Sequence, residues 1–213
     1  MTQTGSDFHV VFIRGPILSS SRSVMNDATP PLAFALLAGH LRHHGYRVTL
    51  IDAIGMGLNR SWAWSGREGY YCKGATFQEI LDALPPDADL FAFSCMFSGE
   101  WPLNRDLIHA VRQKFPRVPA VAGGEHATAL PEYCLRDCSS LDFAATGEGE
   151  GVLLSLCETL RKGQSGSNCR GIKYIDKEGN YVDMGAFSRI EKVDEIPWPA
   201  WDLVAIQFYW ASQ

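Results

Sequence analysis

Short apolar runs alternate with helical patterns along the first three quarters of the chain. The runs are continuous rather than alternating, which is typical of strands buried on both faces of a sheet. Most are followed by a stretch in which apolar residues recur every three or four positions, as on one face of a helix. The expected strands cover residues 9–15, 47–53, 90–95, 119–124 and 142–147.

Helices are expected between and after these strands. The first has Thr29 as its candidate N-cap, Pro30 and Pro31 in its first turn, and Gly45 at its end. The others are expected at residues 75–85, 101–115, 130–138 and 149–162. Five strand–helix units in series predict a flavodoxin-like α/β fold, in which a five-stranded parallel sheet has helices on both faces. We expect the strand order 2-1-3-4-5, with a ligand at the carboxyl ends of the strands.

The pattern changes after Gly163. Residues 164–171 are a Gly/Ser-rich linker, and residues 171–184 predict a β-hairpin outside the parallel sheet. The extended tail that follows has no core of its own, and its aromatic side chains need a partner surface. We therefore divide the chain into an α/β domain, 1–163, and a hairpin and linker, 164–213. The aromatic side chains of the tail are Trp198, Trp201, Phe208, Tyr209 and Trp210.

Composition narrows the classes of partner. The 213 residues carry a net charge of −5, which argues against a general nucleic-acid binder. No apolar run approaches the roughly 20 residues of a membrane span, and the polar N-terminus shows no signal peptide. The six cysteines include no CxxC pair, so free thiols in a reducing compartment, and hence a cytoplasmic location, are expected.

Four loops converge on the expected ligand edge, at residues 14–30, 94–101, 123–130 and 146–151. A Gly-Gly pair at a strand end lets a bulky ligand approach the backbone, although turn geometry alone also explains such a pair. The glycine-rich string at 146–151 partly resembles a dinucleotide-binding loop. Its glutamates would repel a pyrophosphate at the following helix, so an NAD function is disfavoured.

Two motifs on these loops carry a family resemblance. Ser94-x-Met96, followed by Gly123-Gly124, resembles the SxL…GG spacing of cobalamin-binding domains. In that family the serine hydroxyl bonds the base of the nucleotide tail and the glycine pair makes room for it. By resemblance these roles fall on Ser94 and Gly123-Gly124, with Met96 at the leucine position.

The family's DxHxxG motif is missing from the loop after the first strand. Asp27 is present, but Thr29 stands where the histidine is required. The resemblance then implies a cofactor with no protein histidine below cobalt, a histidine-off state. It also argues against the methionine-synthase and mutase subtypes.

Longer strings point to one subgroup. Taken together, residues 30–53, 122–132, 146–160 and 190–203 resemble the N-terminal half of cobalamin-dependent radical SAM enzymes. That group includes radical methyltransferases and the anaerobic magnesium-protoporphyrin ester cyclase. The resemblance covers about residues 9–205 and implies a downstream radical SAM domain that holds S-adenosylmethionine and a 4Fe-4S cluster on a CxxxCxxC motif.

The cluster motif itself is absent here. Cys134 and Cys138 have the first spacing, but Leu141 stands where the third cysteine is required. We therefore expect no catalytic or metal-ligating residue in this chain and no turnover by it alone. His40 and His44 share one helical face, for which a solvated polar surface is favoured over metal binding.

The residues expected to contact cobalamin lie on the converging loops. They are Gly15, Asp27, Ser94, Met96, Phe97, Gly123, Gly124, Glu125, His126, Thr146, Gly147 and Glu148. His126 is equally compatible with a plain polar loop residue, and the glutamates with a charged helix start. The insertion at 54–76 is interpreted either as a lid or docking surface or as a satellite hydrophobic cluster.

Two functional classes stay open. The first is the cobalamin-binding module of a radical SAM methyltransferase or cyclase, truncated before its catalytic domain. The second is a stand-alone flavodoxin-like binding or interaction domain that has lost the cofactor.

Overall fold

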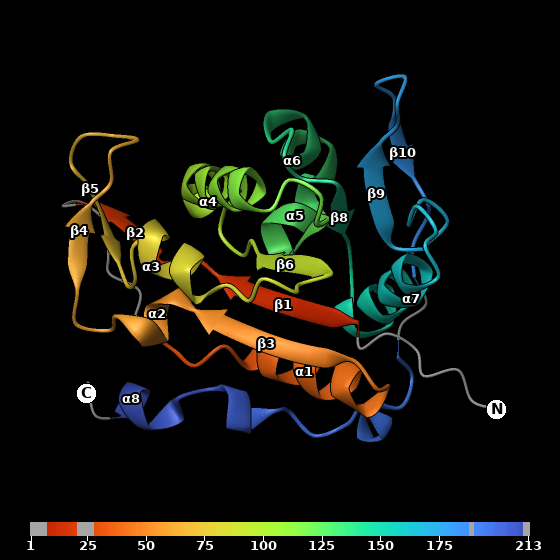
Figure 1. Cartoon of the computed structure of the whole chain (residues 1–213), viewed down its shortest axis with the longest axis horizontal. Coiled ribbons are helices and arrows are strands. Elements are labelled where there is room, and N and C mark those ends of the chain that lie inside the picture. The colour runs from red at the N-terminus through yellow and green to blue at the C-terminus, as the bar shows by residue number, and fades with distance from the viewer. Residues whose placement is uncertain (1–7, 21–27, 188–189, 211–213) are drawn as a thin grey trace.

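The computed structural model describes residues 8–20, 28–187 and 190–210. Its centre is a seven-stranded sheet in the order β10-β9-β8-β7-β6-β1-β3 (Figure 1). Five of these strands are parallel and carry the predicted order 2-1-3-4-5, so the flavodoxin-like fold is confirmed. In spatial order they are β3 (Arg47–Asp52), β1 (His9–Arg14), β6 (Leu90–Ser94), β7 (Ala120–Gly123) and β8 (Phe143–Ala145).

The C-terminal hairpin extends this sheet instead of lying outside it. Its strands are β9 (Ile172–Ile175) and β10 (Tyr181–Asp183). β9 pairs antiparallel with β8, with Ala145 opposite Ile172. An edge strand leaves a row of N–H and C=O groups without partners, and the hairpin satisfies that row on β8. The predicted strand number of five is therefore approximate.

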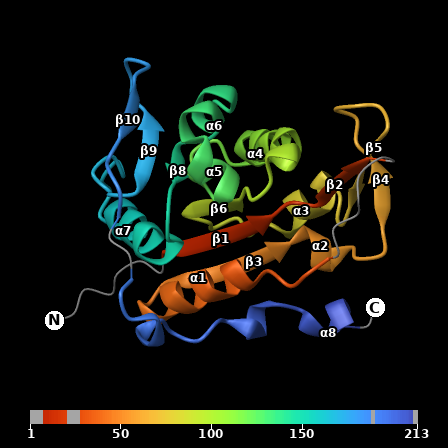
Figure 2. The ribbon, with the colours of Figure 1, turned by 180° about the vertical axis from the view of Figure 1, so that it is seen from behind.

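The longer helices form two layers on the sheet (Figures 1 and 2). Alternate residues of β1 face opposite layers: Val10 and Phe12 pack with one core, and Val11 and Ile13 with the other. This two-sided burial explains the continuous apolar runs. The first layer contains α1 (Leu32–His43) and α7 (Gly149–Arg161). The second contains α3 (Phe77–Ala83), α4 (Trp101–Lys114), α5 (Glu125–Ala129) and α6 (Pro131–Asp137).

The starts of α3 and α1 differ in whether a side chain caps them. Thr76 and Glu79 form a reciprocal capping box at the start of α3. The prediction that Thr29 caps α1 is wrong, because the cap position is Pro31 and no side chain caps it. The Thr29 carbonyl instead accepts a hydrogen bond from Arg14, at 2.6 Å. Gly45 ends α1 as predicted, in the left-handed conformation.

The insertion at 54–76 folds beside the main sheet. After the short helix α2 (Ala53–Met56), it contributes two strands to a separate three-stranded antiparallel sheet with order β2-β5-β4. Trp64 and Cys72 of the insertion pack with Leu103 of α4, which supports the satellite-cluster interpretation. The strands are β2 (Ile17–Ser20), β4 (Ser61–Ala63) and β5 (Tyr70–Lys73).

The C-terminal tail runs alongside α1 (Figure 2). The Ala200 N–H donates to the Ala35 carbonyl at 2.8 Å. A Cβ on Gly39 would stand 2.2 Å from the Trp198 carbonyl oxygen, so the backbones approach this closely because Gly39 has no side chain. The tail contains the 3₁₀ turns η2 (Val193–Glu195) and η3 (Trp201–Leu203) and the helix α8 (Ile206–Trp210).

Two further sequence predictions concern the cysteines and membrane spans. All six cysteines are free, as predicted, and the structure shows that all six are also buried. Within the described ranges, no helix has the length and apolarity needed to cross a bilayer.

Candidate functional site

A cleft opens near the carboxyl ends of the parallel strands, between the sheet and the first turns of α1 and α7. Its volume is about 290 Å³. Seven of the predicted site residues line it: Ser94, Met96, Gly123, Gly124, Glu125, Thr146 and Gly147. The predicted ligand edge therefore coincides with a cavity.

Ser94 and Gly123 are brought together by strand register. They are partners across the parallel pair β6–β7, and the next residue, Cys95, donates its N–H to the Gly123 carbonyl at 2.7 Å. Side chains alternate along a strand, and Ala92 packs with the α1/α7 core. Ser94 lies two positions further on, so it belongs to the same face and lines the cleft.

The two glycines are required for different reasons. Gly124 has φ +104°, and a Cβ there would stand 2.7 Å from the Cys95 carbonyl oxygen and 3.1 Å from the Met96 sulfur. The backbone itself therefore needs glycine at 124. A Cβ on Gly123 would meet no atom closer than 4.0 Å. The missing side chain of Gly123 leaves free space in the cleft rather than relieving strain.

The end of β8 and the first turns of α5 and α7 contribute backbone groups and carboxylates. Thr146 lines the cleft, but its hydroxyl already donates to the Gly171 carbonyl at 3.1 Å. Glu125 and Glu150 border the cavity. Glu148 is not among the lining residues; its carboxylate accepts the Ile190 N–H at 2.8 Å. The cleft is thus acidic at its border, and no lysine, arginine or histidine is among the described residues that line it.

Gly15, Phe97 and His126 also lie away from the cavity, and Asp27 is not placed. Gly15 faces α4, where a Cβ would stand 2.8 Å from the Asn104 carboxamide oxygen. Phe97 is 55% exposed on the loop after β6. Asp27 lies outside the described residues.

His126 points into the opposite layer. It is 3% exposed, its Nδ1 lies 2.8 Å from the Ser98 hydroxyl, and its ring centre is 5.2 Å from that of Trp101. Burial lowers its pKa, so the imidazole tends to be neutral. The short helix α5, which sequence patterning does not predict, directs this side chain away from the cleft.

The deep wall of the cleft is apolar, and sequence analysis did not predict it. Phe12 of β1 and Phe34 of α1 lie with ring centres 4.7 Å apart. The signal for the wall is that the apolar stripes of α1 and α7 both begin in the first turn, at the ligand edge. The wall residues are Phe12, Phe34, Leu37, Ala92, Val121 and Leu153.

A half-buried carboxyl group lies near the same edge. Glu100 precedes α4, and burial raises its pKa to about 7, while a hydrogen bond from the Leu18 backbone and the charge of Arg14 act in the opposite direction. Near neutral pH this group is therefore partly protonated. The residue joins β2 to the start of α4 and does not line the cleft.

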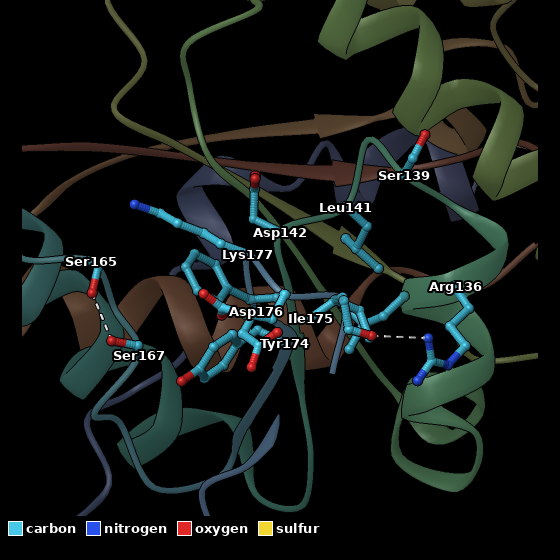
Figure 3. Close-up of a pocket in the computed structure, with 14 residues that line it drawn as sticks. Arg136, Ser139, Leu141, Asp142, Ser165, Ser167, Tyr174, Ile175, Asp176 and Lys177 are labelled. Carbon is cyan, nitrogen blue, oxygen red and sulfur yellow. Dashed lines mark hydrogen bonds between the residues drawn. The ribbon is translucent and has the colours of Figure 1, made fainter. Parts of the chain in front are cut away.

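A larger bowl of about 860 Å³ lies at the other end of β8, beside the turn of the hairpin (Figure 3). Of its three carboxylates, Asp142 and Asp176 have protein partners. Asp142 accepts from the Ala120 N–H and from Arg112, and Asp176 accepts from Asn180. The bowl is open and far from the carboxyl edge, so the smaller cleft is the candidate ligand site.

No trio of His, Cys, Asp or Glu side chains in the described part of the chain is grouped to hold a metal ion.

Comparison with known proteins agrees with the resemblance that the sequence motifs carry. Residues 22–156 match the family model described as "B12 binding domain". The uncharacterized methyltransferase PH0819 of Pyrococcus horikoshii is 26% identical over 204 residues, which cover 95% of this chain and 40% of the relative. The chain thus spans well under half the length of that protein.

Two solved structures share the fold. The cobalamin-dependent S-adenosylmethionine radical enzyme OxsB with aqua-cobalamin bound has a TM-score of 0.70 at 18% identity, covering 97% of this chain and 25% of its own. The radical S-adenosylmethionine methyltransferase TsrM from Kitasatospora setae, with cobalamin and a [4Fe-4S] cluster bound, has a TM-score of 0.60 at 15% identity, covering 90% and 31%.

These findings confirm the resemblance to the cobalamin domains of radical SAM enzymes, with cobalamin as the cofactor. Because the family model covers more than half of the chain, this protein belongs to the B12-binding domain family.

Proposed function

We propose that the chain is the cobalamin-binding module of a radical SAM methyltransferase, and that it holds the cofactor with no protein histidine on cobalt. The observation that carries the proposal is the cleft at the carboxyl edge, with Ser94 and Gly123 paired at its border.

The residues present fit a part of cobalamin. A cleft of about 290 Å³ lies at the lower end of the range for small-molecule sites, so it suits the nucleotide tail rather than the whole corrin. The free space beside Gly123 admits the tail along the sheet edge. Ser94 then donates a hydrogen bond to the base, and the apolar wall excludes water from it. Glu125, at the border, accepts from amide groups that surround a corrin.

Bound cobalamin supplies a cobalt centre that can carry a methyl group or take part in radical chemistry. The part of this chain is to hold the tail and keep one face of the corrin open.

Two observations support the histidine-off state. Residues 16–31 contain no histidine, so that loop offers no imidazole. His126 is held in the opposite layer by Ser98 and Trp101. Without such an imidazole, bound cobalamin would have a cobalt centre with altered electronics.

The complete protein is proposed to extend beyond this chain. The 213 residues contain no CxxxCxxC motif, and the methyltransferase of P. horikoshii is much longer. We therefore assign S-adenosylmethionine and the 4Fe-4S cluster to a downstream domain. Methyl transfer is favoured over ring closure because the names of that relative and of TsrM both specify methyltransferases.

The test uses the full chain mixed with hydroxocobalamin and passed over a sizing column. We expect cobalamin to co-elute with the visible spectrum of a cofactor whose own base is off cobalt. After one-electron reduction, the electron paramagnetic resonance spectrum should lack splitting by a nitrogen ligand. Splitting from a protein nitrogen would refute the histidine-off state. Failure to co-elute would favour a flavodoxin-like domain without cofactor.

A turnover assay separates the module from an enzyme. With S-adenosylmethionine and a reductant, residues 1–213 are expected to form no methylated or cyclised product. Product formed by this chain alone would contradict the assignment of catalysis to another domain.

A further inference from the structure

The wall of the cleft differs in chemistry from its border. The groups that line its depth are hydrocarbon: Phe12 is fully buried, Val121 is 2% exposed and Leu153 is 4% exposed. The aromatic pair of Phe12 and Phe34 lies on the same side of the sheet. A flat bicyclic ring can pack against such a surface over its whole area.

Polar side chains are few along this surface. Besides the bordering carboxylates, the described lining residues offer the hydroxyls of Thr146 and Ser94. Thr146 already donates to the Gly171 carbonyl. The Ser94 hydroxyl therefore remains to donate one hydrogen bond to a ligand.

We propose that this cleft selects corrinoids whose lower base is dimethylbenzimidazole over those whose lower base is a purine. The inference rests on the proposed cobalamin function and extends it to the identity of the base. Phe12, Phe34, Leu37, Val121 and Leu153 are its specificity-determining residues.

The selection follows from hydrogen-bond counting. Once joined to ribose, dimethylbenzimidazole carries one free ring nitrogen, which the Ser94 hydroxyl satisfies, and two methyl groups that gain from burial. Adenine carries an exocyclic amine and three free ring nitrogens. A buried polar group left without a partner weakens binding by about tenfold or more. The phosphate and ribose are common to both ligands, so contacts of the border with these two groups do not discriminate between them.

The experiment compares three corrinoids on the full chain: cobalamin, its adenine analogue adeninylcobamide, and cobinamide, which lacks the nucleotide tail. Equilibrium dialysis read by corrin absorbance gives each dissociation constant. We expect cobalamin to bind roughly tenfold or more tightly than adeninylcobamide, since adenine leaves at least one group unpaired. Cobinamide should bind more weakly than cobalamin, because nothing fills the cleft.

The possible outcomes distinguish a failure of base selection from a failure of the proposed cobalamin-binding function. Equal constants for cobalamin and adeninylcobamide, both tighter than cobinamide, would overturn base selection and leave cobalamin binding intact. Equal constants for all three would show that the tail does not enter the cleft and would also overturn the inference. Binding of none would contradict the proposed function itself.

Variants of the wall residues test whether the wall causes the preference for cobalamin. Leu37→Gln places an amide on the α1 side of the cleft and is expected to reduce the preference for cobalamin severalfold. Leu32→Gln is the matched control, because Leu32 is 52% exposed on the same helix and does not line the cleft. Val121→Thr, nearly equal in size, gives a second test if the first variant folds poorly. An unchanged preference in both wall variants would overturn the assignment.

Discussion

The Tyr209 hydroxyl donates a hydrogen bond to the carboxylate of Asp52, 157 positions earlier in the chain. The same carboxylate forms an ion pair with Arg14, at 3.6 Å. Arg14 also donates to the Thr29 carbonyl. Tail, β3, β1 and the start of α1 are thus joined in one network at the edge that carries the cleft. Burial raises the pKa of Tyr209, reinforced by the nearby Asp52 charge, so the hydroxyl stays protonated and donates.

Tyr209→Phe is expected to lower the free energy of unfolding by about 1.5–3 kcal/mol, the usual value of a hydrogen bond to a charged group. The ring still fills its site, so the loss reports the hydroxyl. Urea denaturation measures it, with Trp210→Phe as control, since Trp210 is 73% exposed on the same helix. Equal losses in the two variants would mean that the Tyr209–Asp52 bond adds nothing.

Glu100 makes stability depend on pH. Its pKa is about 7 in the folded chain against the ordinary 4.5, so between these values the folded state holds a proton that the unfolded state releases. The free energy of unfolding therefore falls as pH rises through this window, by up to about 3 kcal/mol from this group.

Glu100→Gln keeps the shape and removes the charge. Relative to the unmodified chain, the variant should gain stability progressively from about pH 5 to pH 8, as measured by denaturant titration at each pH. The exposed Glu178→Gln provides the control. Parallel pH profiles for the Glu100 variant and the unmodified chain would rule out this carboxyl as the source.

Gly39→Ala tests the docking of the tail on α1. In an exposed helix this change would stabilise by roughly 0.5–1 kcal/mol. Here the new Cβ would stand 2.2 Å from the Trp198 carbonyl oxygen, so we expect a net loss of stability and faster proteolysis of residues 190–210. Gly99→Ala, where a Cβ meets nothing within 4 Å, should be neutral. A stabilised Gly39 variant would show that the tail does not pack here.

The glycine pair offers a matched comparison. Gly124→Ala should destabilise the fold by about 1 kcal/mol or more, because of its positive φ and its clash with Cys95. Gly123→Ala should fold normally but bind cobalamin more weakly, since its Cβ takes space reserved for the tail. Thermal unfolding and equilibrium dialysis separate the two effects. Unaltered affinity in the Gly123 variant would place the tail elsewhere.

Ser94→Ala is expected to weaken cobalamin binding by about 1 kcal/mol, or roughly fivefold, through loss of one hydrogen bond. Stability should change little, because Ser94 is half-buried at a strand end. Cobinamide, which has no base for Ser94 to contact, should bind the variant and the unmodified chain alike. A similar loss for cobinamide would assign Ser94 to the corrin instead.

Much of this fold can be predicted from the local pattern of apolar and polar residues. The run from Val10 to Ile13 has no polar position, so its strand must be covered on both faces, and five such runs require a parallel sheet between helix layers. Carboxyl ends of parallel strands share one edge, which is why Ser94 and Gly123 could be placed together from the sequence. Their opening onto a cavity agrees with that placement.

Other features depended on packing between distant segments. β2 and β5 pair over only four residues each, and some of these residues are polar. Neither strand therefore has an apolar run from which it could be predicted. The hairpin joins β8 because an open edge is available there. His126 sits on a loop of the predicted edge, yet one helical turn directs it towards Trp101.

The amino-acid sequence by itself therefore determined the order of the five parallel strands, the helix layers and the edge at which the cleft opens, because continuous apolar runs indicate strands that are buried on both faces. Only the tertiary structure decided which edge residues face the cleft, that Phe12, Phe34 and Leu153 form its wall, and that Tyr209 reaches Asp52. The physical reason is that these relationships are contacts between segments far apart in the chain, and they exist only once the helices have packed on the sheet.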